Sequence, residues 1–192
     1  MAAQSNLKNM VLCLSIVCLV CSALLAVVYA VTYDPIQEAS RKAVAESIGK
    51  VLPEGVELAS TDPSVASLDG RDYEYYTSAD GAFYAVKSSE TGFGGPLVIM
   101  VGVRAADLEV WNTAVLEKNE TPGLGAKCDT DPKFLANWSY ESRQASGKVL
   151  DAYEVGVDVD AITASTITSR AYAKAVKAAV EVVKNLGGQS NE

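Results

Sequence analysis

Four hydroxyl side chains crowd one short segment near the C-terminal end of this chain. Thr163, Ser165, Thr166 and Thr168 stand within six positions of one another. Serine and threonine are favoured at the start of a helix, because their oxygens accept hydrogen bonds from backbone N–H groups that lack a partner. The same N–H groups and the helix dipole attract phosphate. The segment therefore predicts either a heavily capped helix or an anion site.

The sequence after this cluster predicts an amphipathic helix. Apolar residues recur every three or four positions and so share one face, namely Tyr172, Val176, Val180 and Val183. Arg170 and Lys174 follow the cluster closely, and their charges would favour an attached phosphodiester or simply form a solvated face. Gly187-Gly188 is the expected end of the helix.

A second segment reads Glu120-Thr121-Pro122-Gly123-Leu124-Gly125. Proline followed by glycine suits a type II turn, because proline sets one dihedral and glycine accepts positive φ at the next position. Without side chains, Gly123 and Gly125 would let the backbone approach a flat ring closely. Taken alone, this segment predicts only a turn.

Together the two segments resemble the FMN-binding domain shared by the G subunits of Rnf complexes and the C subunits of sodium-pumping quinone reductases. Residues 160–166 are similar to the flavinylation motif of that family, and residues 120–125 match its loop letter for letter. Residues 92–96, Gly-Phe-Gly-Gly-Pro, add a weaker similarity. One departure is Ala164-Ser165, where the family often has Gly-Ala.

The resemblance implies roles for individual residues. Thr166 would carry FMN through a phosphoester bond, with Ser165 as a competing hydroxyl. Glu120 or Thr121 would hydrogen-bond the polar edge of the isoalloxazine ring, and Leu124 would supply an apolar contact. The remaining expected cofactor-binding positions are Asp160, Thr163, Thr168, Gly123 and Gly125.

The N-terminal region predicts a membrane anchor. Residues 10–31 form a run of 22 residues without a charge, long enough to cross a hydrocarbon core of about 30 Å. A cleaved signal peptide would have a shorter apolar region, of roughly 7–15 residues, and a better small-x-small site than Val28-Tyr29-Ala30. Lys8 before the span favours a cytoplasmic N-terminus, although Arg41 and Lys42 weaken that preference. The body of the chain should then be extracytoplasmic.

The cysteines do not predict a metal cluster. Cys13 and Cys18 would diverge by about 140° on a continuous helix, so Cys13, Cys18 and Cys21 cannot converge without breaking it. Breaking a helix in lipid is costly. Cys128 is the remaining cysteine, and we expect a packed thiol, although its place beside the loop leaves open a contact with flavin.

Composition excludes several classes of function. Residues 34–192 hold 15 basic and 24 acidic side chains and hence a net charge of −9, which argues against nucleic acid as a partner. The chain has no histidine, which excludes histidine-based catalytic triads and the common histidine metal sites. No Gly-x-Gly-x-x-Gly fingerprint occurs, so direct oxidation of NADH by this chain is not expected.

The expected fold class is α+β, with a single transmembrane helix before an FMN-binding domain whose sheet is mainly antiparallel and flanked by helices. We expect a cytoplasmic tail at 1–9, a span at 10–32, a connecting helix at 33–56 and the extracytoplasmic domain at 57–192. Strands are expected at 73–77, 83–87, 97–103, 109–116 (interrupted near Asn112) and 149–157, with a short helix from Asp131-Pro132 to about Trp138.

The function implied by the resemblance is electron transfer through covalent FMN, in an Rnf-type membrane complex that couples ferredoxin–NAD electron transfer to sodium or proton transport. The other subunits and a separate flavin transferase would be its partners. The short chain suits the Rnf subunit better than its longer quinone-reductase counterpart. Two alternatives are a covalent-FMN subunit of another extracytoplasmic electron chain, such as a quinone reductase, and an anchored binding module without flavin.

Overall fold

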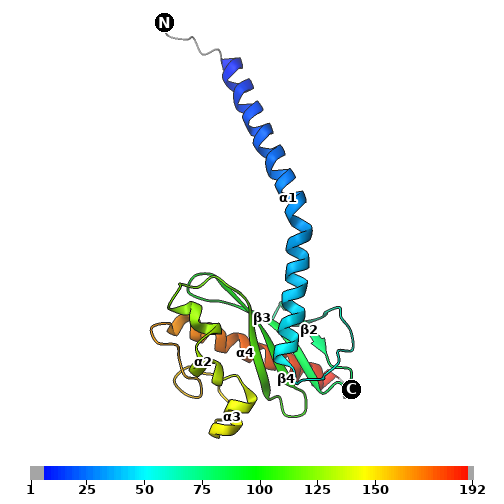
Figure 1. Cartoon of the computed structure of the whole chain (residues 1–192), viewed down its shortest axis with the longest axis vertical. Coiled ribbons are helices and arrows are strands. Elements are labelled where there is room, and N and C mark those ends of the chain that lie inside the picture. Colours follow the sequence, from blue (N-terminus) through cyan, green and yellow to red (C-terminus); the bar gives the residue numbers. More distant parts are fainter. Residues whose placement is uncertain (1–6, 190–192) are drawn as a thin grey trace. The chain divides into compact units, whose positions relative to one another are not determined.

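The structure is a computed structural model that describes residues 7–189, in which a long N-terminal helix precedes an α+β domain (Figure 1). The helices are α1 (Leu7–Val51), α2 (Pro132–Ala136), α3 (Tyr140–Ser146) and α4 (Thr166–Gln189), with a short 3-10 helix η1 (Gly125–Asp129). The strands are β1 (Ser64–Leu68), β2 (Arg71–Thr77), β3 (Phe83–Thr91), β4 (Pro96–Arg104) and β5 (Val110–Lys118).

The five strands form one antiparallel sheet in the order β1-β2-β3-β4-β5, which is also their order in the chain. Every pair is joined by a short connection, as an antiparallel meander requires. The turn between β1 and β2 places Asp69 and Gly70 at positive φ, and Gly81 does the same between β2 and β3. The α+β class with an antiparallel sheet and flanking helices is therefore confirmed.

Each face of the sheet is buried by a different helix. On β4, alternate residues Leu97, Ile99, Val101 and Val103 join the core that α4 covers, whereas Met100 joins a second core with the end of α1. Successive side chains of a strand point to opposite faces, so one strand can serve both cores. A Cβ at Gly102 would overlap the carbonyl oxygen of Val51 at the end of α1, so this position on β4 requires glycine.

Most expected elements are present, and one is wrong. The expected β2–β3 hairpin, β4 and α2 are found, and Trp111 forms a bulge in β5 beside Asn112, where an interruption was expected. Residues 149–157 form a loop instead of a strand, with one isolated bridge between Val155 and Val159. The Asp158 carboxylate accepts three backbone N–H groups of that loop, from Asp151, Tyr153 and Glu154, which a strand neighbour would otherwise bond.

Two short elements and one boundary also differ from expectation. Strand β1 and helix α3 were not expected from the sequence. Helix α4 continues to Gln189, past the glycine pair that was expected to end it. The helix still begins at Thr166, as the hydroxyl cluster indicated.

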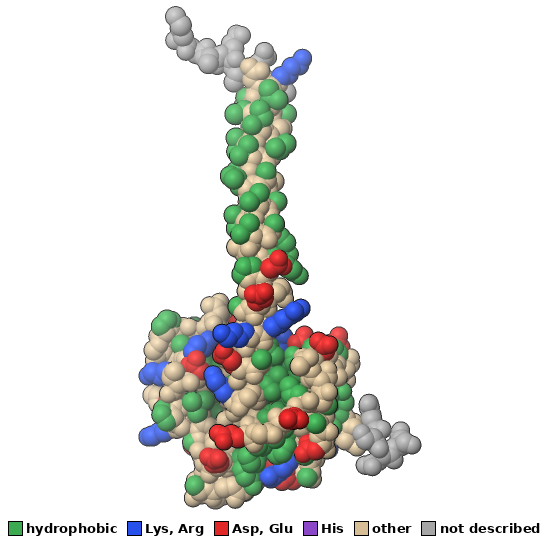
Figure 2. All heavy atoms as spheres, turned by 45° about the vertical axis from the view of Figure 1, so that its right-hand side comes forward, with side chains coloured by type: hydrophobic (Ala, Val, Ile, Leu, Met, Phe, Trp, Pro, Cys, Tyr) green, Lys and Arg blue, Asp and Glu red, His purple; other side chains and the backbone are tan. Residues whose placement is uncertain are grey.

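Helix α1 is long and apolar enough to cross a membrane, by length and composition. It runs without a break through Pro35, so the expected span and connecting helix are parts of one helix. Hydrophobic side chains cover its upper length, and charged side chains are concentrated on the domain (Figure 2). Cys13, Cys18 and Cys21 lie exposed on α1, and among the described residues no group of side chains could hold a metal ion. The boundaries of the tail and span remain a prediction.

Cys128 is fully buried in the core under α4, where burial raises the pKa of its thiol to about 11. The expectation of a packed thiol is confirmed, since the residue does not line the cavity described below.

We expect Cys128 to resist alkylation in the folded protein. A thiol pKa near 11 instead of 9.0 leaves about a hundred-fold less thiolate at pH 8, and the thiolate is the nucleophile. Iodoacetamide labelling, read by peptide mass spectrometry, should modify Cys128 only slowly until urea unfolds the domain. Equally fast labelling with and without urea would contradict the buried position.

Candidate functional site

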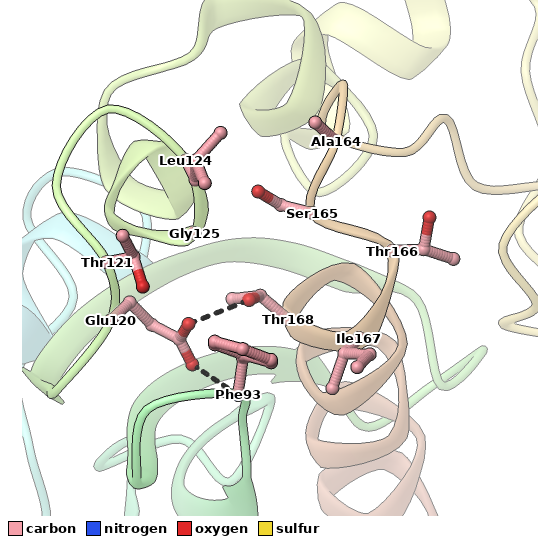
Figure 3. Close-up of a pocket in the computed structure, with 10 residues that line it drawn as sticks. All are labelled: Phe93, Glu120, Thr121, Leu124, Gly125, Ala164, Ser165, Thr166, Ile167 and Thr168. Carbon is pink, nitrogen blue, oxygen red and sulfur yellow. Dashed lines mark hydrogen bonds between the residues drawn. The ribbon is translucent and has the colours of Figure 1, made fainter.

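Three segments that are distant in sequence meet around one cavity of about 360 Å³ (Figure 3). They are the β3–β4 turn, the loop after β5 and the start of α4. The lining residues are Phe93, Glu120, Thr121, Leu124, Gly125, Ala164, Ser165, Thr166, Ile167 and Thr168. The two sequence motifs therefore face each other across a single hollow.

Glu120 joins all three segments. Its Oε1 accepts a hydrogen bond from the backbone N–H of Phe93 at 2.9 Å, and its Oε2 accepts one from Thr168 Oγ1 at 2.8 Å (Figure 3). Hydrogen bonds to a carboxylate are stronger than neutral ones, so one half-buried side chain holds the loop, the turn and the helix together.

Two glycines, which have no side chain, allow the three segments to approach one another closely. A Cβ on Gly125 would lie 2.6 Å from Thr168 Oγ1 and would overlap the Glu120 carboxylate. A Cβ on Gly94 would overlap the backbone carbonyl of Asn119, whose own Nδ2 donates to Gly94 O at 3.1 Å. Glycine at these positions is thus a packing requirement of the site.

The start of α4 is not capped in the way that the hydroxyl cluster suggested. Ser165 directly precedes the helix, yet within residues 7–189 its Oγ has no hydrogen-bond partner. Ser169 organises this turn instead, because its Oγ accepts from Ile162 N at 3.0 Å and donates to Ser165 O at 2.9 Å. The first N–H groups of a helix lack intrahelical partners, and here the hydroxyl beside them is also unpaired.

Neighbouring hydroxyls at this turn have opposite environments. Ser165 is only 7% exposed, and its Oγ points across the cavity toward Leu124 (Figure 3). Thr166 is exposed, and its side chain points outward from the first turn of α4. Ala164 has a φ of +60°, a left-handed conformation that is strained for a residue with a Cβ. The two successive side chains, Ser165 and Thr166, point in different directions (Figure 3).

The cavity has an apolar rim and a single charge. Phe93, Ile167 and Leu124 are 69%, 54% and 43% exposed, and they come from the three different segments. Glu120 is the only charged residue among those that line the cavity, and both of its oxygens are already bonded. Such a hollow suits a flat, largely apolar molecule that also has hydrogen-bonding groups.

Three of the expected site residues lie outside the cavity. Asp160 is exposed and pairs with Lys148 at 2.7 Å, and its backbone is bonded to the side chain of Asn137. Thr163 is exposed on the loop before α4. Gly123 occupies the turn at φ +77°, as the type II turn requires. These residues shape the loops, whereas the other seven expected residues line the cavity.

Phe93, Ala164 and Ile167 line the cavity without having been expected there. The first lies in the glycine-rich turn whose similarity to the family was weak, and a hairpin turn gives no sign of which distant loop it meets. Ala164 and Ile167 lie within or beside the hydroxyl motif. They were not expected at the site because the prediction there was based on polar side chains.

Comparison with known proteins agrees with this geometry. Residues 92–181, which contain every residue of the cavity, match the FMN-binding domain family. The chain is 30% identical to the G subunit of an ion-translocating oxidoreductase complex of Shewanella oneidensis, over 91% of this chain and 87% of the relative. It is 28% identical to the G subunit of the proton-translocating ferredoxin:NAD(+) oxidoreductase complex of Clostridium ljungdahlii (91% and 90%). It is 25% identical to the G subunit of an ion-translocating oxidoreductase complex of Methanosarcina acetivorans (95% and 97%).

Proposed function

Because the chain belongs to the family of G subunits of ion-translocating oxidoreductase complexes, we propose that it is a membrane-anchored electron-transfer subunit that carries FMN covalently on Thr166. In this role it would be a redox subunit of a larger complex, and the other subunits would complete the reaction.

One observation carries the proposal for Thr166: an exposed hydroxyl stands at the rim of an apolar cavity, on the first residue of a long helix. A transferase can reach an exposed hydroxyl, whereas Ser165 is buried and faces inward. The free N–H groups and the dipole at the start of α4 favour the phosphate of a phosphoester. Arg170 lies exposed one turn further along and adds positive charge nearby.

The residues of the cavity fit the rest of the cofactor. Leu124, Phe93 and Ile167 offer apolar surface to a flat ring, and Ser165 Oγ is a buried polar group without a partner. A bound flavin supplies the ability to pass electrons singly between carriers. The chain's own contribution is to hold the ring in place, to exclude part of the surrounding water and to keep the site near its partners.

The membrane anchor determines on which side of the membrane the electron transfer takes place. We propose that residues 10–32 span the cytoplasmic membrane, that residues 1–9 remain in the cytoplasm, and that the domain from residue 57 onward is extracytoplasmic, connected through 33–56. There it would exchange electrons with the other subunits of an Rnf-type complex that couples ferredoxin–NAD electron transfer to ion transport. A separate flavin transferase would attach the FMN, as the resemblance of residues 160–166 to the family's flavinylation motif implies.

The test is intact-mass spectrometry of the full chain after coexpression with a flavin transferase. We expect a gain equal to FMN less one water, with the modification mapped to the peptide that contains Thr166 and with flavin fluorescence that persists on a denaturing gel. An unmodified peptide from native membranes would refute covalent attachment. Subunits recovered after gentle detergent purification distinguish an Rnf-type complex from a quinone reductase.

A further inference from the structure

We propose that Ser165 is a positioning residue whose Oγ–H donates a hydrogen bond to the polar edge of the bound isoalloxazine ring. This inference rests on the proposed function. It assigns a specific hydrogen bond between the chain and the cofactor, in a cavity that is otherwise described by its shape and by Glu120.

The Ser165 hydroxyl is buried without a hydrogen-bond partner. Within residues 7–189, three buried side-chain polar atoms lack a hydrogen bond: Ser88 Oγ, Trp138 Nε1 and Ser165 Oγ. Of these, only Ser165 lines the cavity. A buried hydroxyl without a partner is destabilising, so this position calls for a ligand group or a water.

The other polar side chains of the cavity have partners or face water. Glu120 accepts from Phe93 N and Thr168 Oγ1, so its carboxylate and the Thr168 hydroxyl already bond each other. Thr121 is exposed and can be solvated by water. The Thr166 hydroxyl loses its proton when it forms the phosphoester. Ser165 is therefore the buried side-chain donor that remains for a bound molecule.

The side chains of Ser165 and Thr166 point in different directions (Figure 3). Ser165 Oγ points inward, toward the wall formed by Leu124, whereas the Thr166 side chain points outward (Figure 3). A phosphate attached to Thr166 would lie at the rim of the cavity, so the ring at the other end of the ribityl chain would be the part that enters it. The acceptor for Ser165 is then a carbonyl oxygen or a nitrogen of the ring, not a phosphate oxygen.

The test compares Ser165→Ala in two forms of the full-length protein, expressed with and without the flavin transferase. Without FMN, removing an unpaired buried hydroxyl should leave Tm unchanged or raise it. With FMN, the same substitution should lower Tm and move the flavin midpoint potential to more negative values, because a donor to the ring stabilises its electron-rich reduced form. Ser165→Cys, similar in volume but a weaker donor, should give a smaller shift in the same direction.

Ser88→Ala is the matched control, because Ser88 is also buried and unpaired but lies on β3 away from the cavity. It should shift Tm equally in both forms and leave the potential unchanged. If Ser165→Ala also shifts Tm equally in both forms, the hydroxyl does not contact the cofactor and the inference fails. A Tm difference without any change in potential would assign the hydrogen bond to phosphate and overturn the ring contact. A wild-type chain without the added FMN mass would instead refute the proposed function itself.

Discussion

Thr166→Ala is expected to abolish covalent flavin loading completely. The substitution removes the oxygen that would form the phosphoester, and the neighbouring Ser165 cannot replace it, because its side chain is only 7% exposed and points into the cavity. Intact-mass spectrometry after coexpression with the transferase should show only the unmodified chain. Substitutions at exposed positions usually change stability by no more than about 0.5 kcal/mol, so the variant should unfold at nearly the same temperature as the wild type.

Thr130→Ala is the control for this result. Thr130 is also an exposed threonine, but it lies outside both the motif and the cavity. This variant should load FMN as the wild type does. Loading that survives in Thr166→Ala and disappears in Ser165→Ala would move the attachment site by one residue and would contradict the argument from exposure.

Glu120→Ala is expected to loosen the site while leaving the phosphoester in place. The substitution removes both carboxylate hydrogen bonds and leaves the buried Thr168 hydroxyl without its acceptor. Losing such a partner costs roughly 1–3 kcal/mol, and the low end applies where water can replace it, as at the exposed Phe93. Urea unfolding should measure that loss. Iodide quenching of the attached flavin should rise several-fold, since the carboxylate no longer ties the turn and the helix to the loop.

Two variants make the interpretation of Glu120→Ala specific. Glu117→Ala removes an equal charge from an exposed position on β5 and should change neither stability nor quenching. Glu120→Gln keeps the shape but replaces one accepting oxygen with a donor, so it should lose part of the stability that Glu120→Ala loses. If Glu120→Ala lost no stability, the carboxylate would not be the link between the three segments.

Glu120 has a role in the structure beyond the one that the resemblance implied. A hydrogen bond from Glu120 or Thr121 to the edge of the ring stays a prediction, and both Glu120 carboxylate oxygens already accept hydrogen bonds within the protein. The carboxylate thereby holds the backbone of Phe93 and the hydroxyl of Thr168 in place. Ser165, which the motif presented only as a competing hydroxyl, is the buried group that remains available.

The sequence alone determined the features that depend on neighbouring residues. The uncharged run of residues 10–31, the start of α4 at Thr166 and the β2–β3 hairpin all follow from periodicity and turn residues within one short window. The two motifs likewise indicated the chemistry, because each is a contiguous string. Residues 149–157 differ, because their apolar pattern suited a strand but the Asp158 carboxylate accepts hydrogen bonds from the backbone N–H groups of a loop instead.

Only the tertiary structure decided which groups meet. The contact between Phe93 and Glu120 spans 27 positions and that between Glu120 and Thr168 spans 48, so no local pattern encodes either one. Whether a hydroxyl is buried or exposed also depends on what packs over it, and this separates Ser165 from Thr166 although they are adjacent in the chain. Local sequence sets backbone preference, whereas burial and long-range hydrogen bonds arise only when the turn, the loop and the helix pack together on the sheet.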